Sequence, residues 1–134
     1  MFVVANLDIE TLGNDARSIL KSVQSGELEA ASSALSFDEL VWAVKRNRAP
    51  EDSMTAGEAF LNMPRLRLVP VNGDLLASTL GVMRKYHLDP RDSIHVASAL
   101  AEGAETIVSE DKHFDRVKQI RRRDIRGFHD SASR

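Results

Sequence analysis

The stretch from Leu88 to Val117, LDPRDSIHVASALAEGAETIVSEDKHFDRV, predicts a helix, a strand and a turn in quick succession. Asp89-Pro90 is typical of a helix start, because aspartate can accept from the free N–H groups and proline has no N–H to leave unpaired. Gly103 suits the helix end, since glycine adopts left-handed backbone angles without a Cβ clash. Thr106–Ser109 (TIVS) has the apolar character of a buried strand, and a helical turn is expected over Asp111–Val117. This order predicts one unit of a layered α/β fold.

The rest of the chain continues the same alternation. Apolar spacing and capping residues predict helices over Asn14–Ser25, Ser36–Arg48, Glu51–Met63 and Leu75–Tyr86, and extended segments over Glu27–Ser33, Leu66–Val71 and Asp124–Ile125. Helices that alternate with short apolar strands predict the α/β class with a mainly parallel central sheet.

Two finer expectations concern the helices. Ser36 and Glu39 have the spacing of a capping box, in which the serine accepts from the backbone at position 39 and the carboxylate reaches back. Leu76, Leu80 and Met83 share one helical face, which we expect to be the apolar one.

Composition indicates one ordered domain. The 134 residues are 43% hydrophobic and 28% charged, which is ordinary for a globular protein, and the absence of cysteine excludes disulfides and thiolate zinc sites. We expect the domain to occupy residues 1–128, followed by a polar tail over His129–Arg134. The first residues, MFVVANLDIE, lack the features of a secretion signal, and no apolar run is long enough to span a bilayer, so a cytoplasmic protein is expected.

The net charge of −2 is unevenly divided along the chain. Residues Lys112–Arg126 contain seven Lys/Arg and two Asp, so this segment carries +5 and the remainder carries −7. Such a segment is compatible with a basic surface that meets phosphate groups, and a solvated surface segment is the alternative interpretation.

Four acidic residues are candidates for chemistry. Glu39 lies near one helix start, Asp92 lies in the first turn of another helix, and Asp111 and Asp115 follow TIVS. In a parallel α/β sheet, helix N-termini and strand carboxyl ends share one edge. Two carboxylates about 4 Å apart repel by roughly 4 kcal/mol at an effective dielectric near 20, and a divalent cation removes that repulsion. The alternative is that each acid only stabilises its helix end. Histidines 87, 95, 113 and 129 are scattered, and surface or capping roles are expected for them.

Three blocks resemble the PIN-domain family, and within it the VapC-like toxin ribonucleases. Ala31–Arg46 (ASSALSFDELVWAVKR) looks like the family's second acidic motif, and Leu88–Leu100 (LDPRDSIHVASAL) is similar to the third, with Ser93 in place of an alanine. Glu105–Val117 (ETIVSEDKHFDRV) resembles the fourth. The resemblance covers nearly the whole chain and implies a three-layer α/β/α fold.

The resemblance also implies roles for single residues. Glu39, Asp92 and Asp111 would bind the metal, and Asp115 would be a further catalytic carboxylate. Ser109 matches a Ser/Thr that hydrogen-bonds near the site. Two further residues would be structural: Phe114 is expected in the core, and His95 is expected to pack or hydrogen-bond.

One departure concerns the front of the chain. The family begins with a strand ending in Asp-Thr/Ser-Asn, and no such motif occurs here. FVVA (residues 2–5) is expected to follow that motif, so the first strand would be missing or incomplete, through a start codon assigned too late or a true truncation. Asp8 lies several residues too late to replace the aspartate.

The resemblance implies a Mg²⁺- or Mn²⁺-dependent endoribonuclease that hydrolyses RNA phosphodiester bonds as the toxin of a toxin–antitoxin pair. Basic residues of Lys112–Arg126, with Lys45 and Arg46, would contact the RNA backbone. A homodimer and a cognate antitoxin are the expected partners, with no membrane. Because one aspartate is absent, the alternative is a catalytically impaired PIN domain that binds RNA or protein. A second alternative is an unrelated α/β ligand-binding protein whose acids are only caps.

Overall fold

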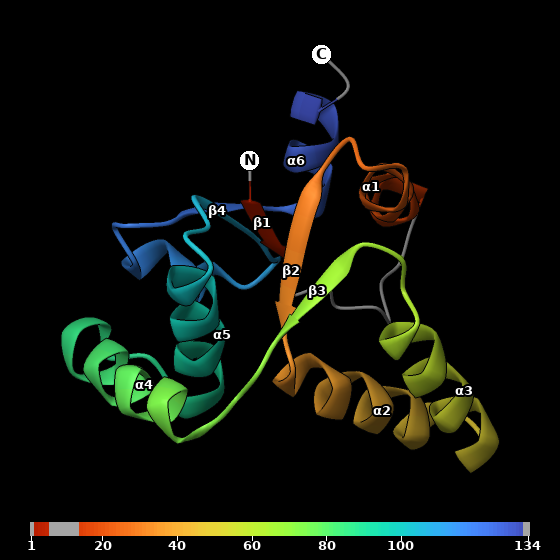
Figure 1. The fold of residues 1–134 in the computed structure, drawn as a ribbon, viewed down its shortest axis with the longest axis horizontal. Helices are drawn as coiled ribbons and strands as arrows, with labels where there is room; N and C mark the ends of the chain where they lie inside the picture. Colours follow the sequence, from red (N-terminus) through yellow and green to blue (C-terminus); the bar gives the residue numbers. More distant parts are fainter. Residues whose placement is uncertain (1, 6–13, 133–134) are drawn as a thin grey trace.

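The computed structural model describes residues 2–5 and 14–132, which form one five-stranded parallel sheet with helices on both sides (Figure 1). The strands are β1 (Phe2–Ala5), β2 (Glu29–Ser33), β3 (Leu66–Val69), β4 (Thr106–Val108) and β5 (Arg121–Arg123). The helices are α1 (Asn14–Ser25), α2 (Leu35–Asn47), α3 (Pro50–Leu61), α4 (Gly73–Tyr86), α5 (Pro90–Ala101), the short 3₁₀ helix η2 (Lys112–Arg116) and α6 (Ile125–Ala132). None of the helices in this described part is both long and apolar enough to cross a bilayer.

The segment FVVA is the central strand of the sheet. The strand order is β3-β2-β1-β4-β5, and Val4 is in register with Ala31 of β2 on one side and Ile107 of β4 on the other. The expectation that FVVA follows a missing first strand is therefore wrong. An uninterrupted apolar run is what a central strand of a parallel sheet requires, because helices cover both faces of such a sheet.

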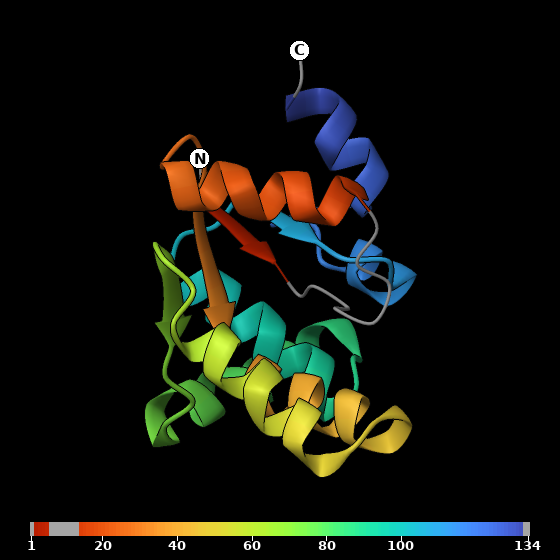
Figure 2. The same cartoon turned by 90° about the vertical axis from the view of Figure 1, so that its right-hand side faces the viewer.

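Neighbouring residues of β4 contribute to two separate cores. Ile107 belongs to a large buried cluster with residues of α4, α5 and η2, while Val108 belongs to a smaller one with Ile19, Ile125 and Phe128. Successive strand residues point to opposite faces, so these clusters lie on the two sides of the sheet. Figure 2 shows α1 and α6 on the opposite side of β1 from α5. This is the three-layer α/β/α arrangement.

Most predicted elements are confirmed, and several of their ends have the expected local chemistry, although Asp89 at the start of α5 makes no side-chain capping hydrogen bond. Gly26 and Gly103, which follow α1 and α5, have φ angles of +86° and +68°. Asn72 caps α4 by accepting from the Leu75 N–H at 3.0 Å. These helix ends could be predicted because the residues that set them are neighbours in the sequence.

The predicted capping box at the start of α2 is wrong. The helix begins at Leu35, whose N–H donates to the Ser33 hydroxyl at 3.2 Å, so Ser36 already lies inside the helix. The Ser36 hydroxyl is buried and accepts from Ser32 at 2.8 Å. The Glu39 side chain is consequently available for a long-range contact.

Two further expectations also fail. No strand forms over Asp124–Ile125, because the last strand is Arg121–Arg123 and α6 begins at Ile125 and extends to Ala132, into the predicted polar tail. In α4, Leu76 and Leu80 are exposed, whereas Leu75 and Val82 are buried. Both faces of α4 carry apolar residues at helical spacing, so packing and not periodicity decides which face is covered.

Candidate metal centre

Asp92 and Asp111 come together at the edge of the sheet where β4 ends and α5 begins. Asp92 lies in the first turn of α5, and Asp111 is the N-cap of η2, two residues after Ser109 at the end of β4. One ligand atom each from Asp92, Asp111 and His113 lie within 4.8 Å of one another. We call these three residues the acidic cluster. The parallel sheet thus joins two of the carboxylates predicted to bind a metal.

A set of local hydrogen bonds holds Asp111 in place. Its N–H donates to the Ser109 hydroxyl at 3.1 Å, and its Oδ1 accepts from the His113 N–H at 2.9 Å. His113 Nδ1 also lies 2.8 Å from the same oxygen. Phe114, fully buried, fixes the turn to the core. The expected roles of Ser109 and Phe114 are therefore confirmed.

Asp92 lies in an environment that disfavours its charged form. Partial burial raises its pKa above the ordinary value of 3.8, and the negative charge of Asp111 raises it further. The nearby imidazoles of His95 and His113 act in the opposite direction. A cation between Asp92 and Asp111 would relieve both unfavourable effects.

Glu39 lies outside the acidic cluster and is held from α5. Its Oε1 is hydrogen-bonded to Nε2 of His95, which is one helical turn from Asp92 and only 1% exposed. His95 Nδ1 is buried and has no hydrogen-bond partner within the described part of the chain. The expectation that His95 hydrogen-bonds is confirmed, and the bond connects α2 to the helix that carries Asp92.

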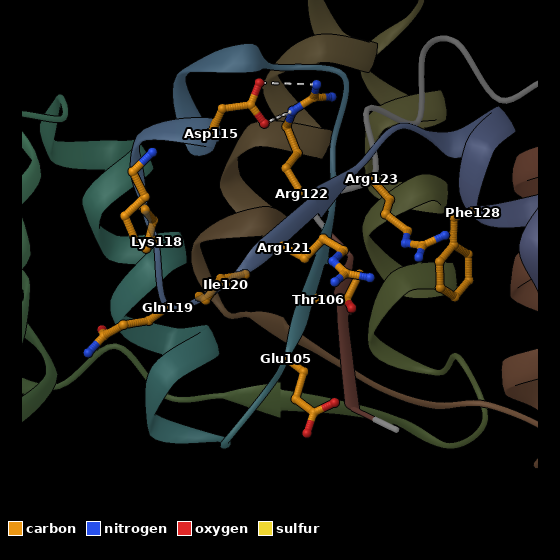
Figure 3. A pocket seen from close by; sticks show the side chains of 11 residues that line it. Glu105, Thr106, Asp115, Lys118, Gln119, Ile120, Arg121, Arg122, Arg123 and Phe128 are labelled. Carbon is orange, nitrogen blue, oxygen red and sulfur yellow. Dashed lines mark hydrogen bonds and ion pairs between the residues drawn. The ribbon is translucent and has the colours of Figure 1, made fainter.

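Asp115 is not part of the acidic cluster and pairs instead with Arg122. Figure 3 shows its carboxylate facing Arg122 of β5, and two hydrogen bonds of 2.8 and 3.3 Å join the pair. The hydrogen bond from Arg122 lowers the pKa of Asp115. Arg122 Nη1 also donates to the Ser109 carbonyl at 3.1 Å, so Asp115 is tied through one guanidinium to the turn before Asp111. This geometry favours a positioning role for Asp115.

The donors of the acidic cluster fit a divalent metal ion. Two carboxylates supply the oxygen ligands that Mg²⁺ and Mn²⁺ prefer, and an imidazole adds a nitrogen ligand. His113 was not predicted from the sequence as a member of this group. The available signal was its position two residues after Asp111, directly beyond a strand end.

A basic hollow lies beside β5. It has a volume of about 680 Å³, and Lys118, Arg121, Arg122 and Arg123 contribute cationic side chains to its lining (Figure 3). Lys118 and Arg121 are exposed, whereas Arg122 is engaged with Asp115. None of the three residues of the acidic cluster lines this hollow. The structure therefore gathers positive charge in a hollow that is separate from the acidic cluster.

Comparison with solved structures shows several with the same fold. VapBC from Salmonella typhimurium bound to DNA matches with a TM-score of 0.73 at 18% identity, covering 93% of this chain and 98% of that chain. VapBC2 from Rickettsia felis bound to promoter DNA matches with a TM-score of 0.72 at 16% identity, covering 92% and 98%. VapC20 from Mycobacterium tuberculosis, a sarcin–ricin loop cleaving toxin, has a TM-score of 0.65 at 18% identity, covering 88% and 95%.

Sequence comparison identifies the family. No curated protein sequence matches the chain significantly. The family profile described as the PIN domain matches residues 2–120, which is most of the chain and includes β1 through η2. The match begins at the first residue of FVVA, in agreement with the structural role of that segment as β1. The chain is a member of the PIN-domain family, with a VapC-like fold.

Proposed function

We propose that this chain is a metal-dependent endoribonuclease that acts as the toxin of a toxin–antitoxin pair. The observation that carries the proposal is the convergence of Asp92, Asp111 and His113 within 4.8 Å at the carboxyl edge of a PIN-domain sheet. Ligands of parallel α/β folds bind at this edge. The structural neighbours include VapBC complexes and a toxin that cleaves the sarcin–ricin loop.

The residues of this chain have separate tasks in that reaction. Asp92 and Asp111 would hold the ion, with Glu39 kept nearby by His95 as a further carboxylate for the metal or its water. Mg²⁺ or Mn²⁺ in such a site activates a water molecule and stabilises charge on the scissile phosphate. Because water would be the nucleophile, no nucleophilic side chain is needed, and the task of Ser109 is to orient Asp111 by accepting from its N–H.

The basic segment Lys112–Arg126 is proposed to bind the RNA backbone. Its exposed Lys118 and Arg121 supply positive charge in the hollow along β5, whereas the acidic cluster by itself would repel a polyanion. Backbone contacts of this kind add affinity without reading sequence. Lys45 and Arg46 at the end of α2 are further candidates.

Protein partners are proposed from the family and from exposed apolar side chains. Trp42, Met54 and Leu61 on α2 and α3 are 52%, 60% and 57% exposed. Large apolar side chains at this exposure are typical of surfaces that another chain covers. We assign a cognate antitoxin and a second copy of this chain as the partners, within the cytoplasm.

One observation favours a second candidate function. The central strand β1 has the sequence FVVA and carries no acidic residue, whereas the family pattern has an aspartate at the end of this strand. Asp8, the nearest acid that follows, lies outside the described residues. With one carboxylate fewer, the domain would act as an RNA- or protein-binding module with impaired catalysis.

Cleavage of single-stranded RNA tests the proposal. The purified chain is expected to cut RNA in the presence of Mn²⁺ or Mg²⁺, and EDTA is expected to stop this cleavage. Asp92→Asn and Asp111→Asn should each lower the cleavage rate by at least about 100-fold, since each substitution removes a charged ligand. Asp74→Asn is the matched control, because Asp74 is an exposed acid in the first turn of α4.

The remaining outcomes separate the alternatives. RNA binding without cleavage in either metal would favour the impaired binding module. If cleavage persists in EDTA or in Asp92→Asn, the metal-dependent mechanism is wrong. If the chain neither binds RNA nor takes up metal, the nuclease proposal fails as a whole.

A further inference from the structure

His113 differs from His87 and His95 in its surroundings. It is the member of the acidic cluster that is not a carboxylate, and its side chain is 60% exposed, so an ion from solvent can reach it. His95, by contrast, is buried and hydrogen-bonded to Glu39. His87 ends α4 with its backbone in the left-handed region at φ +55°.

The contact between His113 and Asp111 holds the imidazole beside a carboxylate that is proposed to bind the metal. His113 Nδ1 and Asp111 Oδ1 are 2.8 Å apart, so a nitrogen and an oxygen ligand atom lie side by side. Asp111 Oδ1 also accepts from the His113 N–H, so the imidazole and the carboxylate start from one rigid turn. Because one ligand atom from each of Asp92, Asp111 and His113 lies within 4.8 Å of the others, these three side chains could hold one ion between them.

The chemistry of the donor set indicates which ion the group prefers. Mg²⁺ is a hard cation that binds oxygen, whereas imidazole nitrogen suits transition metals. The carboxylate missing from β1 leaves the site with less negative charge, and this lowers its affinity for Mg²⁺ in particular. A nitrogen ligand compensates for this loss of affinity only when the ion also binds nitrogen well.

We propose that His113 is a ligand of the metal centre and makes the site select a transition-metal ion such as Mn²⁺ over Mg²⁺. This inference rests on the proposed function, because it assigns a further ligand to the same site. The competing explanation is that His113 only pairs with Asp111 to stabilise the start of η2. The two explanations differ in what a metal titration reports.

Metal binding to the metal-free protein tests the assignment without relying on activity. Mn²⁺ affinity is measured from the electron paramagnetic resonance signal of free Mn²⁺, and Mg²⁺ affinity is measured by competition. His113→Gln is expected to weaken Mn²⁺ binding by about tenfold or more and Mg²⁺ binding much less. His113→Asp, which replaces the nitrogen ligand by an oxygen ligand, is expected to strengthen Mg²⁺ binding relative to Mn²⁺ binding. His87→Asn is the control, because asparagine tolerates the left-handed backbone and His87 is exposed.

Three results would contradict the inference, and they are distinguishable. If Asp92→Asn abolishes Mn²⁺ binding but His113→Gln changes neither affinity, His113 is only a structural partner of Asp111 and the proposed metal centre stands. Equal losses for both ions in His113→Gln would mean that His113 does not set selectivity. If Asp92→Asn also leaves Mn²⁺ binding unchanged, the proposed function itself loses its metal site.

Discussion

At the scale of the single residue, Asp92 is the best evidence that this edge of the sheet serves function and not stability. Burial and the charge of Asp111 raise its pKa, so the folded protein disfavours its ionised form. A group whose charge is unfavourable in the folded state is typical of a functional site. The neighbouring Ser93 and Val96 are buried, so the helix is held in place by packing that does not involve Asp92.

The pKa of Asp92 predicts a pH-dependent effect on stability in the absence of metal. Because the folded-state pKa is raised above 3.8, the contribution of Asp92 to stability is fully present below 3.8 and is lost as pH rises through the raised value. Asp92→Asn removes this loss, so at pH 7 the variant should unfold on the order of 1–3 °C higher than the metal-free wild type. Below pH 3.8 the two proteins should be equally stable.

Thermal unfolding followed across pH 3–7 in EDTA checks this prediction. Asp74→Asn is again the control, because an exposed acid in a first turn favours the helix and its removal should not stabilise the protein. A variant Asp92→Asn that is no more stable than wild type at pH 7 would show that the charge of Asp92 is well accommodated without metal.

At the scale of the element, the 3₁₀ helix η2 depends on β5 for its position. Arg122 contacts η2 through Asp115 and the turn before η2 through the Ser109 carbonyl. The Arg122 side chain is 15% exposed, so most of it is removed from solvent. One side chain of an edge strand therefore joins η2 to the end of β4, in addition to the hydrogen bonds and the buried Phe114 that hold Asp111.

Substitution of either partner should loosen the metal centre without unfolding the domain. Arg122→Gln and Asp115→Asn are each expected to weaken Mn²⁺ binding by about tenfold, as loss of a group that orients a ligand does. The amide of His113 should exchange with solvent faster in both variants. Arg126→Gln, an exposed change on α6, is the control.

The double variant decides whether the two residues act together. If they form one positioning unit, Arg122→Gln combined with Asp115→Asn should weaken Mn²⁺ binding no more than either change alone. Additive losses would indicate instead that the two residues act independently, as expected if Asp115 were a further catalytic carboxylate with a task of its own.

At the scale of the whole molecule, charge is divided between two neighbouring surfaces. The mild net charge of −2 conceals a +5 segment, and the fold gathers four of its cationic side chains around the hollow beside β5. The acidic cluster lies outside that lining. A polyanion can therefore be attracted by one surface while its phosphodiester is presented to the other.

The salt dependence of RNA binding tests whether the cationic side chains of the hollow attract RNA. The double variant Lys118→Gln with Arg121→Gln should lower the affinity for single-stranded RNA. The slope of log K against log salt concentration should also become shallower, by about 0.7 for each phosphate that the protein no longer neutralises. Mn²⁺ affinity should not change, because neither residue belongs to the acidic cluster. Arg17→Gln with Lys21→Gln on α1 removes the same charge from exposed positions outside the hollow. Equal effects from both pairs would mean that RNA responds to net charge alone.

Much of the fold could be predicted because its signals are local. The α5–β4–η2 unit, the glycines at helix ends and the proline starts depend on residues a few positions apart. The position of FVVA within the sheet was not predictable in this way, since strand order depends on which distant segments pair. The same holds for α4, where two apolar faces compete for one core.

The sequence by itself determined the alternation of helices and strands, the family motifs, and the positions of Asp92 and Asp111 at a helix start and a strand end. Only the tertiary structure decided which of the four candidate acidic residues lie together and which pair with other side chains. It holds Glu39 against His95, 56 residues away, and turns Asp115 toward Arg122. It also adds His113 to the acidic cluster. The physical reason is that helix starts and strand ends are set by neighbouring residues, whereas the side chains that meet depend on how α2, α5, η2 and β5 pack against one another.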